Sequence, residues 1–296
     1  MAYGRGDSLL LDNILDDLEA SEYFEILKNE TIFGQFRLKG GMVSRLVSIQ
    51  GHFSESIPHD EGVKVVSYPI YRHPVDEDEV TPKLMPFNEI VKDIKGKIED
   101  RIYIQLGKRE NFNHCLIQYY RNGDDWIGEH ADKTLDIAHN SLIVNFSLGC
   151  TRTLMLRPKR NDRNEHNRDI QRIRLLHNSL FILGPETNRY FVHGIKPNKR
   201  IDSMKQPDEL LFGKQRISLT FRRVATFKSD TFDLHTNELL HSTLVGQGAP
   251  TDNKTKDPND NEIQRLYEAF STENRSSDYD WNELYGGFLS MQTIRY

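Results

Sequence analysis

The sequence predicts a mainly β fold with flanking helices, an α+β arrangement around one good-sized core. Short β-type runs follow one another between residues 114 and 223, each bounded by Gly, Pro, Asn or Asp. This pattern is typical of a barrel or sandwich and not of a parallel α/β sheet. Two helical patterns precede these runs, so the helices should pack outside the sheets. A chain of 296 residues with 37% hydrophobic residues and a mean hydropathy of −0.64 is typical of a soluble globular protein.

The first third of the chain contains the two predicted helices. Residues 7–28 place leucine, isoleucine and phenylalanine at roughly helical spacing, with acidic residues between them. Residues 88–101 repeat isoleucine and valine on one face and predict the second helix. The intervening sequence predicts two short strands, at 32–36 and 44–49, and a loop rich in Pro, His and Asp from 51 to 86.

The β-type runs continue to the end of the predicted core. They are 114–120, 142–148, 153–156, 173–176, 179–183, 190–192 and 217–223. Beyond them, a short amphipathic helix is predicted from 263 to 270. We therefore expect three parts: an N-terminal helical segment (1–29), a central domain (30–227) and an acidic C-terminal extension (228–296). The aromatic residues of the extension would be unusual in a disordered tail, so we expect it to dock on the core.

The negative charge of the chain is concentrated in the extension. The whole chain carries a net charge of −5, whereas residues 228–296 contain twelve acidic and six basic residues, a net charge of −6. The difference leaves +1 for residues 1–227. The overall acidity therefore says little about what the central domain binds.

Composition also excludes several classes of protein. Two cysteines are too few for a disulfide scaffold or a cysteine-based zinc site. No apolar run approaches the roughly 20 residues that span a bilayer, and aspartates among the first leucines exclude a secretory signal peptide. We expect an intracellular monomer, in the nucleus or the cytoplasm, without a membrane partner.

Three residues predict a metal site. His130 and Asp132 stand two positions apart, so in a strand-like stretch their side chains project to the same side. His193 follows in a second apolar stretch and can approach from another strand. Two imidazoles and one carboxylate form the facial triad of non-haem Fe(II) oxygenases. Each residue alone also fits a structural role, such as a buried histidine or a turn aspartate.

Two arginines predict an anion site. Arg216 and Arg222 lie six positions apart in an apolar strand, on the face that also carries Ser218 and Thr220. Two inward guanidinium groups would be costly in a core without an anion to pair them. A dicarboxylate fits, because guanidinium and carboxylate match in a bidentate manner. A surface strand with solvated arginines fits the spacing equally well.

Together, these pieces resemble the AlkB-like Fe(II)- and 2-oxoglutarate-dependent dioxygenases over roughly residues 30–227. The matching stretches, in order, are Ile32-Phe33-Gly34 with Ser44-Arg45, Tyr120-Arg121-Asn122-Gly123, His130-Ala131-Asp132, Ser147-Leu148-Gly149 with Arg152, His177-Asn178-Ser179-Leu180, Thr187-Asn188, His193, and the strand from Arg216 to Arg222. The joint pattern is highly specific, whereas no single piece is.

The resemblance implies a double-stranded β-helix, or jelly-roll, core in which His130, Asp132 and His193 hold Fe(II). The co-substrates would be 2-oxoglutarate and O2, and the co-products succinate and CO2. On an N-methyl group, the hydroxylated product would collapse to formaldehyde and the free amine. The implied enzyme class is an Fe(II)/2-oxoglutarate-dependent dioxygenase, which is an oxidoreductase.

The same resemblance implies the co-substrate site. Arg216 and Tyr120 would bind the distal carboxylate of 2-oxoglutarate. Arg222 would pair with the carboxylate next to the keto group, and Thr220 would assist. Gln118 stands where the family commonly has an asparagine, two residues before the tyrosine. The full set of expected co-substrate residues is Tyr120, Gln118, Arg216, Ser218, Thr220 and Arg222.

The substrate implied by the resemblance is methylated DNA or RNA, from which an N-alkyl group is removed. A basic run between residues 157 and 174 would neutralise phosphates, although a solvated surface hairpin fits the same run. Aromatic residues near the site would stack on a base. The candidate substrate contacts are Arg45, Trp126, Thr134, Asp136 and Tyr190.

Two alternatives stay open. Lys133-Thr134-Leu135 follow Asp132, where the nucleic-acid repair members carry acidic residues that contact the damaged base. A hydroxylase or demethylase of a small molecule or a protein side chain, with the same iron chemistry, therefore also fits. A non-enzymatic binding module ranks last, because all three ligand positions and both arginines are present. Stimulation of succinate formation by methylated nucleic acid favours the first hypothesis, and a binding module predicts no turnover of 2-oxoglutarate.

Overall fold

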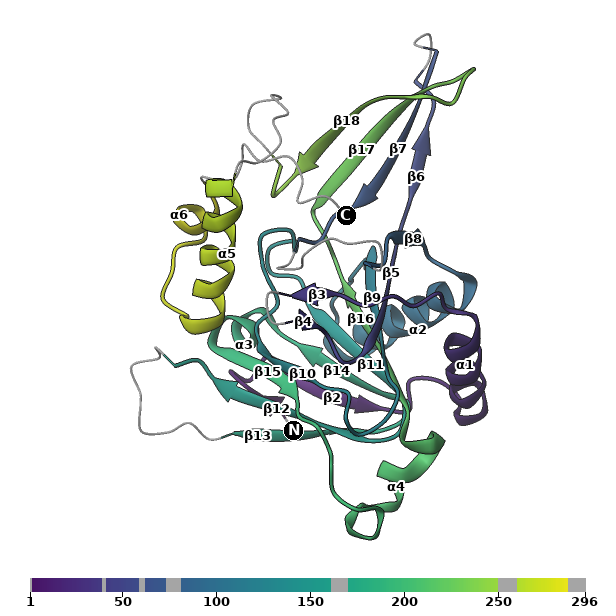
Figure 1. Cartoon of the computed structure of the whole chain (residues 1–296), viewed down its shortest axis with the longest axis vertical. Coiled ribbons are helices and arrows are strands. Elements are labelled where there is room, and N and C mark those ends of the chain that lie inside the picture. The colour runs from purple at the N-terminus through teal and green to yellow at the C-terminus, as the bar shows by residue number, and fades with distance from the viewer. Residues whose placement is uncertain are drawn as a thin grey trace.

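Two facing sheets form the centre of the molecule (Figure 1). The structure is a computed structural model that describes residues 2–38, 41–58, 62–72, 81–160, 170–249 and 260–286. Eight consecutive strands build the two sheets: β9 (His114–Tyr120), β10 (Ile127–His130), β11 (Ile143–Gly149), β12 (Arg152–Pro158), β13 (Gln171–Leu175), β14 (Ser179–Leu183), β15 (Phe191–Ile195) and β16 (Arg216–Arg222).

Successive strands alternate between these sheets. The first sheet has β14, β11, β16 and β9 side by side in its centre, with further strands at both edges, and the second contains β10, β15, β12 and β13. Only β12 and β13 follow each other within one sheet, as an antiparallel hairpin. This winding is that of a double-stranded β-helix. The predicted fold class, mainly β with flanking helices and a jelly-roll core, is confirmed.

Apolar side chains from both sheets fill the space between them. Phe181 and Leu183 from β14 meet Leu154 and Leu156 from β12 in one buried cluster. These residues stand two apart in each strand, so they share the inward face. The alternation therefore directs one face of each sheet into a common core, in which the candidate site lies.

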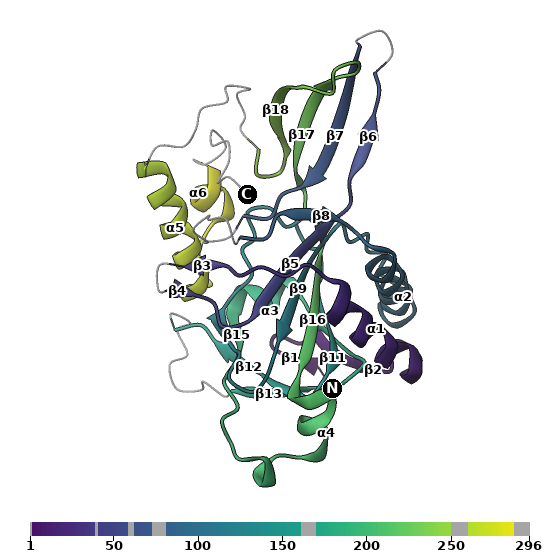
Figure 2. The same ribbon diagram turned by 45° about the vertical axis from the view of Figure 1, so that its right-hand side comes forward.

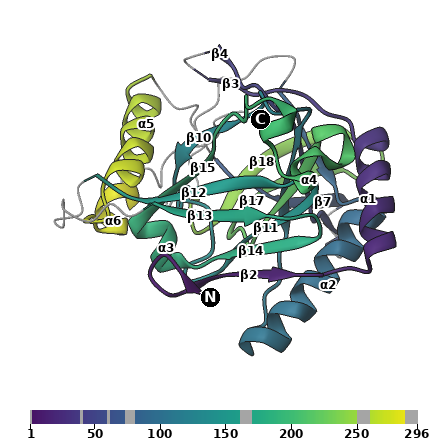
Figure 3. The same ribbon diagram turned by 90° about the horizontal axis from the view of Figure 1, so that it is seen from below.

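Two helices cover the outer face of the first sheet: α1 (Asp17–Glu30) and α2 (Glu89–Leu106). Figures 2 and 3 show both on the same side of the molecule. Val91, Ile94, Ile98 and Ile102 in α2 are fully buried, at spacings of three and four. The Asn88 side chain accepts a hydrogen bond from the Val91 N–H and caps the helix. The second predicted helix is therefore confirmed.

The first predicted helix begins ten residues too early. Residues 8–12 form strand β2 (Ser8–Asp12), and a two-residue strand β1 (Ala2–Tyr3) pairs with it. β2 adds to the first sheet beside β14. Leu9 and Leu11 pack against the cluster under the helices, whereas Leu10 packs against the cluster between the sheets. A strand that is apolar on both faces gives a run of leucines, which sequence periodicity cannot separate from a helix.

The other edge of the first sheet differs from the prediction in detail. Strand β5 (Leu46–Gly51) corresponds to the predicted strand at 44–49 and pairs with β9. The predicted strand at 32–36 is wrong, because only Gly34 forms an isolated bridge there, with Val47. The remaining strands on this side are β3 (Arg37–Leu38), β4 (Gly41–Met42) and β8 (Leu84–Pro86).

A third sheet projects from the core, at the top of Figure 1. Its strands are β18 (Leu239–Gly246), β17 (Thr226–Asp233), β7 (Val63–Pro69) and β6 (Ser54–Ser56), in that order. The loop predicted from 51 to 86 is therefore wrong for β6, β7 and β8, while residues 73–80 lie outside the described ranges. The two hairpins of this sheet are far apart in the chain, so no local sequence pattern predicts that they pair.

The predicted C-terminal extension (228–296) contributes most of β17 and all of β18 to the third sheet, and then forms α5 (Asp260–Arg275) and α6 (Trp281–Tyr285), on the left of Figure 1. The predicted helix at 263–270 is confirmed and is longer than expected. Leu266, Phe270 and Tyr285 pack with Leu135 of the core.

The short helices are α3 (Pro185–Tyr190), α4 (Pro207–Leu210), and the 3-10 turns η1 (Asp202–Met204) and η2 (Leu211–Lys214). Every helix among the described residues is too short or too polar to cross a lipid bilayer. The boundaries of the three predicted parts stay a prediction.

Candidate metal and co-substrate site

The three predicted metal ligands converge. His130 ends β10 and pairs in register with His193 of the adjacent β15, so the two rings lie side by side with centroids 4.5 Å apart. Asp132 follows β10, and its Oδ1 lies 3.6 Å from Nε2 of His130 and 3.8 Å from Nε2 of His193. The three ligand atoms all lie within 4.8 Å of one another. Two imidazoles and a carboxylate in this arrangement fit the facial triad of an Fe(II) site.

The histidines are held in the form that binds a metal. Nδ1 of His130 lies 2.9 Å from the Gly128 carbonyl oxygen, so this nitrogen carries the proton and Nε2 presents its lone pair. Burial, followed by the charge of His193, lowers the pKa of His130 to about 3. Burial also lowers the pKa of His193. Both rings are therefore neutral at physiological pH, as metal ligation requires.

The two oxygens of the Asp132 carboxylate face different partners. Oδ2 accepts hydrogen bonds from Nε of Arg222 at 2.9 Å and from Nη2 of Arg222 at 2.8 Å. Oδ1 faces the two histidines. Burial alone would raise the pKa of Asp132, but the charge of Arg222 holds it below its usual range. Arg222 thus keeps this carboxylate ionised and oriented, with Oδ1 directed at the two imidazoles.

The opposite end of β16 presents a buried cation that has no anionic partner in the described part of the chain. Arg216 is fully buried, and its Nη2 donates to Asn145 Oδ1 at 3.0 Å and to Ser147 Oγ at 2.8 Å. Among the described residues, its Nε and Nη1 have no hydrogen-bond partner. Burial lowers the pKa of Arg216 to about 10. A buried guanidinium with two unused donor nitrogens fits a carboxylate ligand, which is the role expected for 2-oxoglutarate here.

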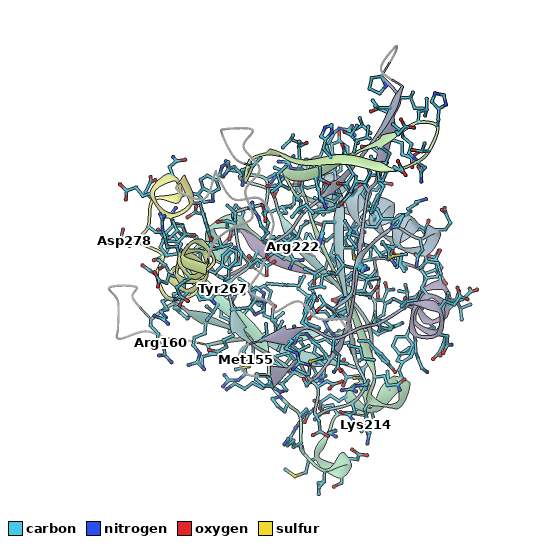
Figure 4. The ribbon with its side chains drawn as sticks, turned by 45° about the horizontal axis from the view of Figure 1, so that its top comes forward. Met155, Arg160, Lys214, Arg222, Tyr267 and Asp278 are labelled. Atoms are coloured by element: carbon cyan, nitrogen blue, oxygen red, sulfur yellow. The ribbon has the colours of Figure 1, made fainter. Side chains whose placement is uncertain are left out.

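A pocket lies beside the three predicted metal ligands and Arg222. Its lining residues are Leu116, Gln118, Tyr120, Ile127, His130, Asp132, Ile143, Asn145, Leu154, Phe181, Leu183, His193, Ile195, Ser218, Thr220 and Arg222. Five of the six predicted co-substrate residues are among them. The sixth, Arg216, is not among the lining residues, but its guanidinium lies 5.2 Å from the centre of the ring of Tyr120, which is one of them. Figure 4 shows Arg222 near the middle of the molecule.

Sequence reasoning missed Asn145 in this pocket. Its Nδ2 donates to Ser218 Oγ at 2.8 Å and to Thr220 Oγ1 at 2.9 Å, while its Oδ1 accepts from Arg216. The side chain therefore orients both hydroxyls and the guanidinium. The available signal was the strand Ile143-Val144-Asn145-Phe146-Ser147, in which polar residues alternate with apolar ones inside a core segment.

Three of the five substrate candidates lie around the site. Arg45 is buried, and its Nε donates to Gln118 Oε1 while its Nη1 donates to the Trp126 carbonyl at 3.2 Å. Trp126 is 47% exposed and directly precedes β10, the strand that ends at His130. Tyr190 ends α3, directly before β15, and the guanidinium of Arg5 lies 4.5 Å from the centre of its ring. Their role toward a substrate stays a prediction.

The other two candidates face away from the pocket. Thr134 donates its N–H and its hydroxyl to Glu273 of α5. Asp136 is fully buried, and both of its oxygens accept hydrogen bonds from Arg72. The structure therefore does not bring these two residues to the pocket, because their polar groups are already used within the protein.

Comparison with known proteins agrees with this geometry. The family model for the 2OG-Fe(II) oxygenase superfamily matches residues 7–222. The mouse DNA oxidative demethylase ALKBH2 is 31% identical over 134 residues, which cover 45% of this chain and 51% of the relative. The human ALKBH2 is 30% identical over 121 residues, covering 40% of this chain and 42% of the relative. The chain thus spans about half the length of the curated relatives that it matches. The predicted AlkB-like resemblance and enzyme class are confirmed, and the chain belongs to the 2OG-Fe(II) oxygenase superfamily.

Proposed function

We propose that this protein is an Fe(II)- and 2-oxoglutarate-dependent dioxygenase that removes N-alkyl groups from nucleic-acid bases. The observation that carries the iron chemistry is the convergence of His130, Asp132 and His193 beside a buried arginine with unused donors. The nucleic-acid substrate is supported by the curated relatives, which are named DNA oxidative demethylases. For an N-methyl base, one O2 and one 2-oxoglutarate would give the hydroxymethyl base, succinate and CO2, and the hydroxymethyl group would leave as formaldehyde.

The residues of the site have distinct tasks in this proposal. Iron would supply the oxidising chemistry once 2-oxoglutarate and O2 are bound. His130, Asp132 and His193 would hold the ion, with both imidazoles neutral and the carboxylate ionised. Arg216 would bind the distal carboxylate of 2-oxoglutarate through Nε and Nη1. The apolar side chains lining the pocket would exclude water from the reacting C–H bond.

The surface outside the pocket supports a polyanionic substrate less strongly than the sequence predicted. Arg157 pairs with Glu129, and Arg174 pairs with Asp208. Lys159 is buried, while Arg172 is exposed on β13. Residues 161–169 of the basic run lie outside the described ranges, so these contacts concern only its described part, and the salt dependence of activity is the informative measurement for the whole run.

The test measures succinate and formaldehyde with a set of methylated oligonucleotides. We expect a methylated oligonucleotide to stimulate both products in a one-to-one ratio, and the rate to fall as salt rises. An unmethylated oligonucleotide of the same sequence is the control. Turnover of 2-oxoglutarate that no methylated DNA or RNA increases would contradict the nucleic-acid substrate and leave the iron chemistry intact.

A second candidate function is hydroxylation or demethylation of a small molecule or a protein side chain. It is favoured by the position two residues after Asp132, where Thr134 stands and bonds to Glu273 instead of facing the pocket. A mass-spectrometric screen of metabolites and peptides, incubated with iron and 2-oxoglutarate, tests it. A product that carries one added oxygen, formed only with 2-oxoglutarate present, would establish this alternative.

A further inference from the structure

The segment that carries Asp132 is held by side chains and not by a sheet. β10 ends at His130, and residues 131–134 have no regular secondary structure. Each of their four backbone N–H groups nevertheless donates to a side chain from another element. The acceptors are Asn274 for Ala131 (2.9 Å), Asn188 for Asp132 (2.9 Å), the Tyr71 hydroxyl for Lys133 (3.0 Å) and Glu273 for Thr134 (3.1 Å).

Two of these four acceptors come from α5, in the C-terminal extension. Asn274 Oδ1 also accepts from Lys133 Nζ at 2.5 Å, and that ammonium donates in turn to the Ala131 carbonyl at 2.6 Å. Oδ1 of Asn274 therefore holds the residues on both sides of the ligand Asp132. The superfamily match ends at residue 222, so α5 lies outside the part of the chain that defines the family.

Glu273 is fixed at least as firmly as Asn274. This residue is 1% exposed, and its carboxylate accepts from the Thr134 N–H, the Thr134 hydroxyl and, at 2.5 Å, the Tyr285 hydroxyl. A buried carboxylate is stable only when such donors satisfy it. Glu273 thus joins the ligand segment to α6, the last helix of the extension.

The same short helix that supplies Asn188 also contacts the extension. Arg189 in α3 donates from Nε to the Ser277 carbonyl at 3.0 Å and from Nη2 to the Tyr279 carbonyl at 2.8 Å. Leu135 packs into the apolar cluster of the extension. Figures 1 and 3 show α5 beside α3 and β15. The extension therefore contacts both the segment that carries Asp132 and α3, the helix that supplies Asn188.

We propose that α5 is a working part of the metal centre, with Asn274 and Glu273 as positioning residues for the segment that carries Asp132. The inference rests on the metal site of the proposed function. Without these acceptors, the N–H groups of Ala131 and Thr134 lose their partners, the Lys133 ammonium loses one of its two, and the irregular segment gains other conformations. Metal affinity then falls, because the ligand must be ordered again when the ion binds.

The experiment titrates Co(II) alone into the full chain, without 2-oxoglutarate, and follows the visible absorption of the bound ion. Asn274→Leu keeps the shape of the side chain and removes the acceptor. We expect its Co(II) affinity to fall about 10-fold or more, the range typical of outer partners of metal ligands. Asn274→Asp keeps an oxygen at the same place and should stay within about threefold of the unsubstituted protein.

The matched control is Asn88→Ala. It also removes an asparagine oxygen that accepts one backbone N–H, that of Val91 at 2.8 Å, but at the N-terminus of α2 on the far side of the first sheet. Loss of such a cap costs about 1 kcal/mol of stability, so this variant reports what a general loss of stability does to Co(II) binding. We expect its affinity to be unchanged.

Glu273→Gln is a milder second variant, in case Asn274→Leu does not fold. It keeps one acceptor oxygen, and we expect a loss of Co(II) affinity of roughly threefold to tenfold. Unchanged affinity in the folded Asn274 and Glu273 variants would overturn the positioning role while leaving the metal site in place. An equal loss in Asn88→Ala would also overturn it. An unsubstituted protein that binds no Co(II) would overturn the metal site itself.

Discussion

Two buried carboxylates four residues apart, Asp132 and Asp136, differ in how their oxygens are used. Each pairs with a buried arginine, Asp132 with Arg222 and Asp136 with Arg72. Asp132 gives Arg222 one oxygen and keeps the other beside two imidazole nitrogens. Both oxygens of Asp136 are occupied by the Arg72 backbone and side chain. Burial and an arginine partner therefore do not mark a candidate metal ligand, whereas the oxygen of Asp132 that faces two imidazoles does.

The ion pair between Asp136 and Arg72 connects the third sheet to the core. Arg72 follows β7 of the third sheet, and its Nη2 also donates to the carbonyl of Gly248, which follows β18, at 2.7 Å. A Cβ on Gly248 would lie 2.2 Å from Arg72 Nη2 and 2.6 Å from Asp136 Oδ1, so only glycine allows this approach. Asp136 thus anchors both hairpins of the third sheet to the segment that continues from the metal ligands.

The largest effect should come from Asp132→Asn. The amide keeps the shape of the side chain but removes the charge that pairs with Arg222 and that a metal requires. We expect succinate formation to fall by at least about a thousandfold, because a direct ligand must matter more than outer partners whose loss costs about 10–100-fold. Product assays together with Co(II) titration measure the loss. Activity within about tenfold of the unsubstituted protein would remove Asp132 from the metal site.

Asp136→Asn should show the reverse pattern. Removing one partner of a buried ion pair costs about 3–5 kcal/mol, because the other charge stays buried. We expect the free energy of unfolding, measured in urea, to fall by about 3 kcal/mol. Co(II) affinity of the folded variant should change by less than about threefold, since Asp136 faces away from the pocket. A large loss of affinity without a loss of stability would place Asp136 in the metal site after all.

Local sequence patterns predicted the parts of the fold that depend on neighbours in the chain. The strands at 114–120 and 179–183 were predicted at their observed bounds, because each is an apolar run between polar turns. His130, Asp132 and His193 were predicted together from residue type and order, and the structure brings them within reach of one another. Asp136 was misjudged because its partner Arg72 lies 64 positions away. Asn274 was missed for the same reason, since it lies 143 positions from Ala131. A single sequence does not reveal such distant pairs.

Arg216→Lys tests the cation that pairs with no anion among the described residues, in contrast to the paired Arg222. Lysine keeps the charge but loses the planar pair of donors that a carboxylate binds. We expect the KM for 2-oxoglutarate to rise about tenfold, the equivalent of one hydrogen bond to a charged group at about 1.5 kcal/mol. Co(II) affinity measured without 2-oxoglutarate should stay the same. An unchanged KM would exclude Arg216 from the co-substrate site.

The smallest effect should come from a third, exposed carboxylate, Asp93 in α2. Its hydrogen bond from Lys97 lowers the pKa of Asp93, and Lys97 also pairs with Glu19 of α1. A lowered folded-state pKa stabilises the protein above the unfolded pKa near 4, and this contribution is lost as pH falls through the folded value. Because the side chain of Asp93 is 41% exposed, solvent screening should limit the contribution to roughly 0.5 kcal/mol.

Lys97→Met therefore tests whether exposure, and not charge pairing as such, separates Asp93 from Asp136. We expect Tm to fall slightly at pH 7. The difference between the variant and the unsubstituted protein should shrink as the pH is lowered from about 5 to about 3, because the contribution of Asp93 is lost as the pH falls from its unfolded pKa through its lowered folded pKa. Thermal unfolding at several pH values measures both effects. A loss at pH 7 as large as that of Asp136→Asn would contradict the distinction, since an exposed pair would then stabilise as much as a buried one.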